Sequence, residues 1–249
     1  KRWVADLRPA AFSPARVGPE PAAIGTSRLT GPDQPIFIVS LHKVGTRSTH
    51  AFIESLGYTG IHYPKYAGDL DLEDWLERRG ASRSQALDAI LERFPDCQVF
   101  SDVPIPGLYR EALARFPDAT FILVTRDPRY WWNTLYRHWH LRKGSRRLDY
   151  FEYLQYAPYD YPRERPVSRA DRDLFMRIFE QHERDVTALF AQSSNFLKTN
   201  LDQDHLEPEL AQFLGAEHYE PMPYVRTGNR QVTSKLGHLV YRLRSRLAR

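Results

Sequence analysis

The fold of this chain is decided by the stretch Phe37-Ile38-Val39-Ser40-Leu41-His42-Lys43-Val44-Gly45-Thr46-Arg47-Ser48-Thr49, which runs on into an amphipathic segment ending at Gly57. The apolar run predicts a buried strand, Lys43 to Gly45 a tight turn, and residues 45–56 a helix. The first N–H groups of a helix lack an acceptor within it, and glycine lets the backbone approach a ligand closely. Because Lys43 adds a full positive charge, the turn is predicted to bind an anion such as a nucleotide phosphate.

This turn differs from the phosphate loop of the common nucleotide triphosphatases. That loop carries two glycines and ends in Gly-Lys-Ser/Thr, whereas here Lys43 precedes the single Gly45. A Lys-x-Gly-Thr turn also occurs in strand-to-helix connections that bind nothing. The anion site therefore needs support from a second motif.

The second motif follows another apolar, β-rich run at residues 119–125. Arg126-Asp127-Pro128 comes directly after it, and an aspartate before a proline predicts the start of a helix, here at 128–142. Arg126 then lies at the carboxyl end of a strand, and Thr134 lies about two turns inside the helix. The chain thus predicts two cationic sites at strand ends.

Together the two motifs resemble the sulfotransferase family that uses 3′-phosphoadenosine-5′-phosphosulfate (PAPS). That family binds the 5′-phosphosulfate with a strand, a Pro-Lys-x-Gly-Thr turn and a helix. It binds the 3′-phosphate with a strand, Arg-Asp/Asn-Pro and a serine eight residues after the arginine. Here His42 replaces the proline and Thr134 replaces the serine. The resemblance covers about residues 35–229 and is closer to the bacterial and Golgi-type members than to the cytosolic branch.

The resemblance implies a donor site built from both motifs and from a third element near the end of the chain. Arg226-Thr227-Gly228 is similar to an Arg-Lys-Gly element that closes over the 3′-phosphate in the family, although a plain basic loop is the alternative. Lys43 would neutralise the leaving group. The implied donor-binding residues are Lys43, Val44, Gly45, Thr46, Arg47, Ser48, Arg126, Thr134, Arg226 and Gly228.

A candidate base follows the strand predicted at 97–101. Cytosolic relatives carry Thr-His-x-Pro at such a strand end, with the histidine as base, and Ser101-Asp102-Val103-Pro104 fits that pattern with Asp102 instead. A carboxylate can take the proton of an acceptor hydroxyl or amine if it is correctly placed. The alternative is that Asp102 caps the turn before Pro106. His42 and His62 are further candidates for the base, and the spacing of the histidines predicts no metal site.

The order of predicted elements defines the fold class. Strands and helices alternate along the chain, which predicts an α/β fold with three layers and a mainly parallel central sheet covered on both faces. The resemblance implies the P-loop-like sulfotransferase architecture. The aromatic, proline-containing segment from Tyr150 to Pro166 is interpreted as an acceptor-side lid or as a packed loop without a continuous helix. We expect an extended, proline-rich segment at 1–34, one domain at 35–234 and a basic amphipathic helix at 235–249.

Charge and cysteine content restrict partners and location. The chain has 35 Lys and Arg against 31 Asp and Glu, and five of the 35 lie in residues 235–249, so the remaining 30 leave the body about neutral. This argues against nucleic acid as a partner. The terminal helix either docks on a membrane surface or a partner, or packs on its own domain. The single cysteine, Cys97, fits a cytoplasmic location, with the Golgi lumen or membrane association as alternatives.

The sequence therefore predicts an enzyme that moves a sulfuryl group from PAPS to a hydroxyl or amine by in-line transfer, with a carboxylate base and no metal. The acceptor is a carbohydrate, a phenol, a tyrosine or a lipid, and nothing in the sequence fixes the oligomeric state. Two other classes stay open: a P-loop-type kinase or nucleotide-binding protein, and a nucleotide-binding module without catalysis. The kinase is disfavoured because Gly-Lys-Ser/Thr and a magnesium-binding carboxylate are not evident.

Overall fold

The computed structural model describes residues 34–143, 147–222, 224–225 and 231–232. Within them, the central sheet has five parallel strands in the order β2-β5-β1-β6-β7. These strands are β1 (Ile36–Ile38), β2 (Gly60–His62), β5 (Val99–Ser101), β6 (Thr120–Thr125) and β7 (Phe196–Asn200). Two short antiparallel pairs accompany the sheet: β3 (Tyr66–Ala67) with β4 (Leu70–Asp71), and β8 (Tyr224–Val225) with β9 (Gln231–Val232).

Helices cover both faces of this sheet, which confirms the predicted three-layer α/β fold. Side chains alternate along β1, so that Ile36 and Ile38 join one apolar core while Phe37 and Val39 join the other. Strands buried on both faces are typical of parallel sheets. The helices are α1 (Thr46–Ser55), α2 (Leu72–Arg78), α3 (Arg83–Arg93), α4 (Tyr109–Arg115), α5 (Pro128–Lys143), α6 (Tyr150–Tyr156), α7 (Arg172–Leu189) and α8 (Leu206–Phe213).

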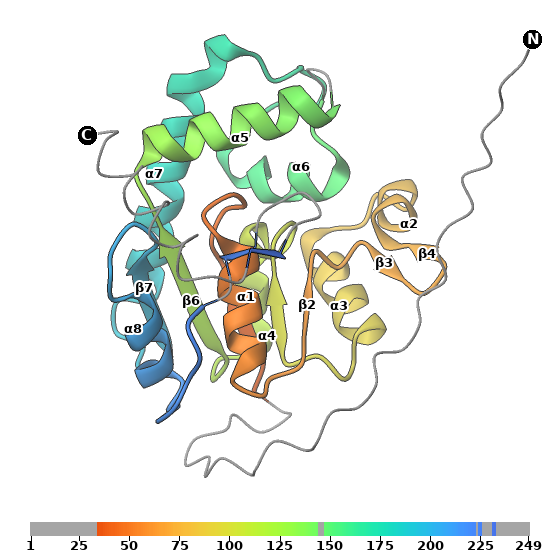
Figure 1. Ribbon diagram of the computed structural model, residues 1–249. Coiled ribbons are helices and arrows are strands. Elements are labelled where there is room, and N and C mark those ends of the chain that lie inside the picture. The colour runs from red at the N-terminus through yellow and green to blue at the C-terminus, as the bar shows by residue number, and fades with distance from the viewer. Residues whose placement is uncertain (1–33, 144–146, 223, 226–230, 233–249) are drawn as a thin grey trace, which may run out of the picture.

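The carboxyl ends of the five strands lie at one edge of the sheet. Figure 1 shows α5 and α6 above this edge, with the turn from β1 into α1 beneath them. Ligands of open α/β sheets bind beyond the carboxyl ends of the strands. The fold therefore brings the segments that follow β1, β2, β5 and β6 to the region where a ligand is expected.

The aromatic segment after residue 149 differs from its prediction. Residues 150–156 form helix α6 instead of a loop, and Asp149 and Glu152 make a capping box at its start. Phe151 and Tyr156 are fully buried, so packing holds this helix in place. The pattern Asp-x-x-Glu is a recognised start signal for a helix, and the density of aromatic residues and prolines obscured it.

Predictions for the ends of the chain lie outside the described residues. This applies to the extended segment at 1–34, apart from its last residue, and to the terminal helix at 235–249. Among the helices that the structure does describe, none is long and apolar enough to cross a membrane.

Candidate functional site

The turn between β1 and α1 has the backbone of an anion-binding turn. Gly45 precedes the helix with φ 92°, and within the described residues no side chain caps the helix start. The first turn carries no acidic residue, and the first helical hydrogen bond runs from the Thr49 amide to the Gly45 carbonyl, 3.0 Å. The N–H groups of residues 46–48 precede this bond, so the helix itself offers them no carbonyl acceptor. They supply the partial positive charge that an anion requires.

The residues of this turn differ in their exposure. Val44 and Thr46 are buried, Lys43 and Ser48 are half-buried, and Arg47 is exposed. A Cβ atom on Gly45 would lie 2.8 Å from the side chain of Leu201. Glycine is thus required here both by its positive φ and by the close approach of the loop after β7.

Arg126 joins the two predicted motifs. This side chain is buried, and its Nη1 donates to the backbone carbonyl of Lys43 across 3.2 Å. Its Nη2 lies 3.5 Å from the carboxylate of Asp202, and the guanidinium lies 4.1 Å from the centre of the Tyr130 ring. Two segments that are 83 residues apart in sequence are therefore in direct contact at the sheet edge.

Asp202 was not recognised in the sequence. It follows β7, pairs with Arg126 and accepts a hydrogen bond from the Asp127 amide, 3.1 Å. Its place after a strand was the only available signal. Thr134 lies on α5, and its hydroxyl donates to the Tyr130 carbonyl, 3.0 Å. Tyr130 thus connects Arg126 with Thr134.

His42 is buried in an aromatic environment. Its ring packs edge-on against Trp139 and Tyr156, and Trp131 donates its indole N–H to the His42 carbonyl, 2.8 Å. The Tyr156 hydroxyl lies 3.3 Å from its Nε2. These contacts fix the backbone directly before Lys43.

Three neighbouring strand ends carry a residue other than glycine in the left-handed region. These residues are Lys43 after β1 (φ 71°), Tyr63 after β2 (φ 64°) and Asp102 after β5 (φ 66°). Such conformations cost free energy for residues with a Cβ atom, and they cluster at functional sites. The three strands lie side by side, so these conformations mark one region of the sheet edge.

Asp102 forms an ion pair with His62. The His62 Nε2 lies 3.0 Å from Asp102 Oδ2, and the side chains are 14% and 15% exposed, so a bound molecule can reach them. The other carboxylate oxygen of Asp102 accepts from the Val103 amide, 2.9 Å. Asp102 thus makes the turn contact expected of a cap and also belongs to a pair of titratable groups.

His62 also belongs to a chain of polar contacts that leads away from Asp102. His62 Nδ1 lies 2.8 Å from the Ser101 hydroxyl, which lies 2.9 Å from Nδ1 of His50; Nε2 of His50 faces Glu54 at 3.5 Å. Burial, and then the charge of His62, lower the pKa of His50 to about 4 against the opposing effect of Asp102, so His50 is neutral.

A carboxylate only accepts hydrogen bonds, so the proton of His50 is assigned to Nε2, opposite Glu54. Its Nδ1 then accepts from the Ser101 hydroxyl. The oxygen of Ser101 in turn accepts from Nδ1–H of His62. The Ser101 hydroxyl thus connects the ring of His50 with the ring of His62, whose Nε2 faces Asp102.

The charges around Asp102 favour its ionised form. Burial raises the pKa of this carboxyl, but the hydrogen bond and charge of His62, followed by the charges of Lys43 and His42, outweigh burial and hold the pKa well below its usual range. The influence of Lys43 places the anion-binding turn electrostatically close to the pair formed by Asp102 and His62.

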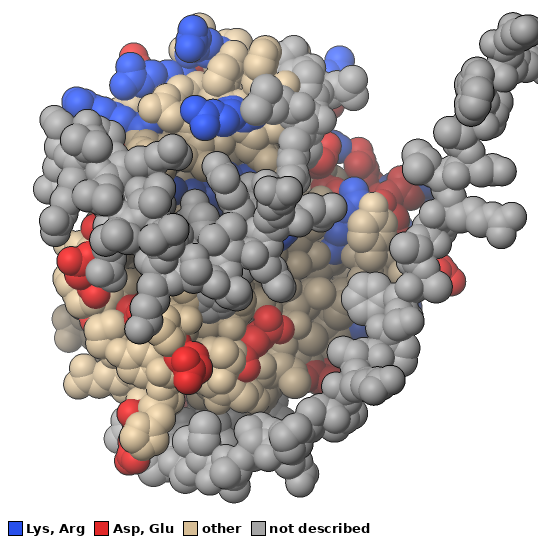
Figure 2. Space-filling view, viewed as in Figure 1, with Lys and Arg blue, Asp and Glu red and all other residues tan. Residues whose placement is uncertain are grey.

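Basic side chains lie over the helix that follows Arg126. Figure 2 shows Lys and Arg gathered at the end of the molecule where α5 lies, and Arg129 and Arg137 on this helix are exposed. A positive field at this end attracts an anionic ligand toward the strand ends. Arg226 and Gly228 lie outside the described residues. Among the residues described, no three His, Cys, Asp or Glu side chains are grouped so as to hold a metal ion.

The fold defines an α/β protein, and its candidate anion site lies at the carboxyl edge of the parallel sheet. The sulfotransferase domain family matches residues 35–231. The chain therefore belongs to the sulfotransferase family, and this membership supports an enzyme of that activity. The architecture is similar to the crystal structure of a sulfotransferase from Alicyclobacillus acidocaldarius, with 14% identity, a TM-score of 0.45, and coverage of 85% of this chain and 92% of that one. The comparison with curated proteins gives no match.

Proposed function

We propose that this protein transfers a sulfuryl group from PAPS to a hydroxyl or amine acceptor. The observation that carries the proposal is the hydrogen bond from Arg126 to the Lys43 carbonyl, because it joins two cationic motifs at one edge of the sheet. A donor that carries one phosphate on the 3′ carbon and one on the 5′ carbon of the same ribose needs two anion sites close together.

The proposed donor site uses each motif for one anionic group. Lys43 and the amides of residues 45–48 hold the 5′-phosphosulfate, and the charge of Lys43 stabilises the bridging oxygen as its bond to sulfur breaks. Arg126 and Thr134, together with Arg226 and Gly228, are assigned to the 3′-phosphate. The positive φ of Gly45 supports this turn, in which backbone amides are the proposed contacts to the phosphate.

In the proposed reaction, the acceptor oxygen or nitrogen attacks sulfur in line with the leaving phosphate oxygen. The bond from the acceptor to sulfur forms, the bond from sulfur to the bridging oxygen breaks, and 3′-phosphoadenosine-5′-phosphate departs. The acceptor's proton passes to the ionised carboxylate of Asp102, which His62 holds in place within the pair. The base is thus a hydrogen-bonded pair rather than the isolated carboxylate expected from the sequence.

His42 is assigned a positioning role in this proposal. Its ring is buried, and its backbone carbonyl is held by Trp131, so it fixes the turn that carries Lys43. A cytoplasmic location is proposed with this function and is supported by the free thiol of the single cysteine, Cys97.

Calorimetry with 3′-phosphoadenosine-5′-phosphate in the presence of a chelator tests the donor assignment. We expect micromolar or tighter affinity, about −8 kcal/mol. Equal affinity for ATP with magnesium would favour the kinase class and contradict the proposal. Turnover of sulfur-labelled PAPS then separates the enzyme from a module that only binds the nucleotide.

A further inference from the structure

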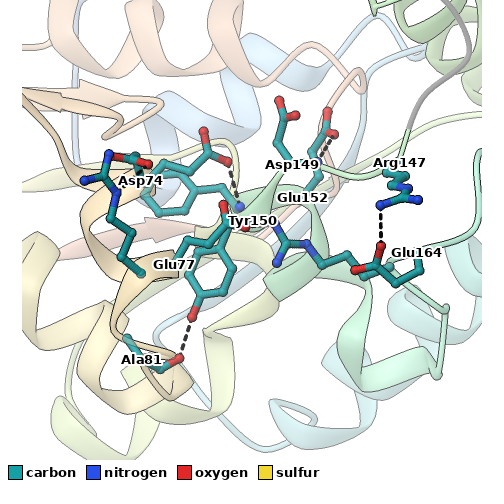
Figure 3. A network of polar contacts seen from close by, with 12 residues as sticks. Asp74, Glu77, Ala81, Arg147, Asp149, Tyr150, Glu152 and Glu164 are labelled. Atoms are coloured by element: carbon teal, nitrogen blue, oxygen red, sulfur yellow. Dashed lines mark hydrogen bonds and ion pairs between the residues drawn. The ribbon is translucent and has the colours of Figure 1, made fainter.

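An open cavity of about 560 Å³ lies between α2 and the segment that leads into α6. Figure 3 shows its charged side chains, with Asp74 and Glu77 on α2 facing Asp149 and Tyr150 at the start of α6. The volume is in the range of cavities that hold small molecules. The groups assigned to the donor do not line it.

A short stretch of chain links this cavity to the pair formed by Asp102 and His62, neither of which lines it. Lys65, which lines the cavity, comes three residues after His62 at the end of β2. The backbone between them is fixed, because the Tyr63 amide donates to the Ser101 carbonyl, 3.0 Å, and the Lys65 amide donates to the Tyr63 carbonyl, 2.7 Å. One short stretch of chain therefore provides both a member of the pair and a wall of the cavity.

The Tyr63 side chain lies between the two regions. Its ring packs edge-on against Phe151, with the ring centres 6.4 Å apart. Burial raises the pKa of Tyr63, and nearby carboxylates raise it further; these are Glu73, Asp149, Glu152 and Asp102. Tyr63 follows His62 directly in the chain. Its ring contacts Phe151, whose amide donates to the cavity-lining Glu73, so these contacts lead from the end of β2 to the cavity wall.

A buried ion pair fixes one wall. Lys65 Nζ lies 2.7 Å from one oxygen of Glu73, and the other oxygen of Glu73 accepts from the Phe151 amide, 2.8 Å. Lys65 also contacts Asp71 at 3.5 Å. The ammonium of Lys65 is thus held between two carboxylates, and it lies 5.6 Å from the centre of the Tyr66 ring.

Further ion pairs fix the opposite wall. Arg163 pairs with Glu77 and covers the ring of Tyr150, with its guanidinium 5.5 Å from the ring centre. Arg147 pairs with Glu164 at 2.7 Å near the rim (Figure 3). Three cationic and four carboxylate side chains thus line the cavity together.

This lining selects among the four acceptor classes that the sequence left open. Seven of the ten lining residues are charged, so a lipid or a plain phenol would remove water from them without replacing its hydrogen bonds. The three cations and four carboxylates nearly balance, which does not favour a polyanion. The neighbouring hydroxyl groups of a sugar both donate and accept hydrogen bonds. They can therefore pair with cationic donors and carboxylate acceptors that are held in place.

We infer that this cavity binds the acceptor and that the acceptor is a saccharide, either neutral or carrying one amine. The inference rests on the proposed function, because it takes the pair formed by Asp102 and His62 as the group that receives the acceptor's proton. The cavity then holds the sugar while one hydroxyl or amine group points toward the donor.

The test compares glucosamine, methyl glucoside, 4-nitrophenol and decanol as acceptors of label from sulfur-35 PAPS. We expect kcat/KM for one of the saccharides to exceed that of the phenol and the alcohol by at least about 10-fold. Glu77→Gln, which removes a charged acceptor with little change of shape, should raise the saccharide KM about 10-fold and leave kcat within about 2-fold. The matched control Asp88→Asn, on the exposed face of α3, should change neither value.

Affinity for 3′-phosphoadenosine-5′-phosphate is measured on the same samples. Preference for 4-nitrophenol or decanol, or an unchanged saccharide KM in Glu77→Gln, overturns the acceptor assignment while nucleotide binding keeps the proposed function intact. Absence of nucleotide binding together with absence of transfer to every acceptor overturns the proposed function, and the acceptor assignment with it.

Discussion

The pair formed by Asp102 and His62 can be tested with a double-mutant cycle. The variants are Asp102→Asn, His62→Gln and the combination of both. If the pair acts as one base, each single replacement should lower kcat by about 100-fold, which corresponds to about 2.7 kcal/mol of activation free energy. The double variant should be no slower than the slower single variant, because the unit is already lost. The coupling energy is then also about 2.7 kcal/mol.

The structure explains why Asp102→Asn should still fold. The amide oxygen of asparagine can accept from Val103, as the carboxylate does, and its NH2 group can donate to Nε2 of a neutral His62. We expect a loss of about 1 kcal/mol in stability and a melting temperature lower by a few degrees. Turnover of labelled PAPS, nucleotide calorimetry and thermal melting are measured on each variant, with Asp88→Asn as a control. Additive losses near 10,000-fold would refute a shared base, and near-normal turnover in Asp102→Asn would assign it to the turn alone.

Three further predictions concern the donor site and the stability of the fold. Arg126→Ala should weaken binding of the product nucleotide by about 2 kcal/mol with kcat little changed, whereas Lys43→Ala should lower kcat; normal calorimetric affinity in Arg126→Ala would contradict the assignment. Gly45→Ala should lose about 1–2 kcal/mol of stability because of the positive φ at this position. The new methyl group would also lie 2.8 Å from the Leu201 side chain, so the turn should shift and nucleotide binding should weaken. The control Gly57→Ala has a similar φ and open space around its Cβ position, so it should lose stability only. Burial lowers the pKa of His182 to about 4, so between about pH 6.5 and 4 the unfolded chain binds a proton that the folded chain does not. The free energy of unfolding should therefore fall as pH falls, by up to about 1.4 kcal/mol per pH unit. Urea unfolding of His182→Asn should show a weaker dependence of this free energy on pH, and an unchanged dependence would exclude this histidine as the cause.

Sequence alone determined the order of the elements and the place of the charged groups along the chain. The apolar runs before Lys43, Asp102 and Arg126 each became a buried strand. Asp102 and Arg126 follow their strands directly, and Lys43 lies in the turn after β1. Strand and helix signals are local, because they depend on residues that are a few positions apart. Since parallel strands end at one edge of their sheet, three separate residues could be assigned to one region without any knowledge of their contacts.

Helix α6 shows where local signals were misinterpreted. Its capping pair Asp149 and Glu152 was present in the sequence, but the aromatic residues between 150 and 161 favoured an interpretation as a lid or loop. Burial of Phe151 and Tyr156 in the two cores decided the matter. Packing supplied a stabilisation that helix propensity alone does not provide.

The chemistry of the site was decided by tertiary structure. Arg126 reaches the Lys43 carbonyl because β1 lies between β5 and β6, and His62 reaches Ser101 because β2 pairs with β5 in a register that sets the two residues opposite each other. These contacts join segments 83 and 39 residues apart. Strand order and register arise from the packing of the whole sheet and its helices, so no local pattern contains them. The contact between Asp102 and His62 therefore became visible only in the tertiary structure.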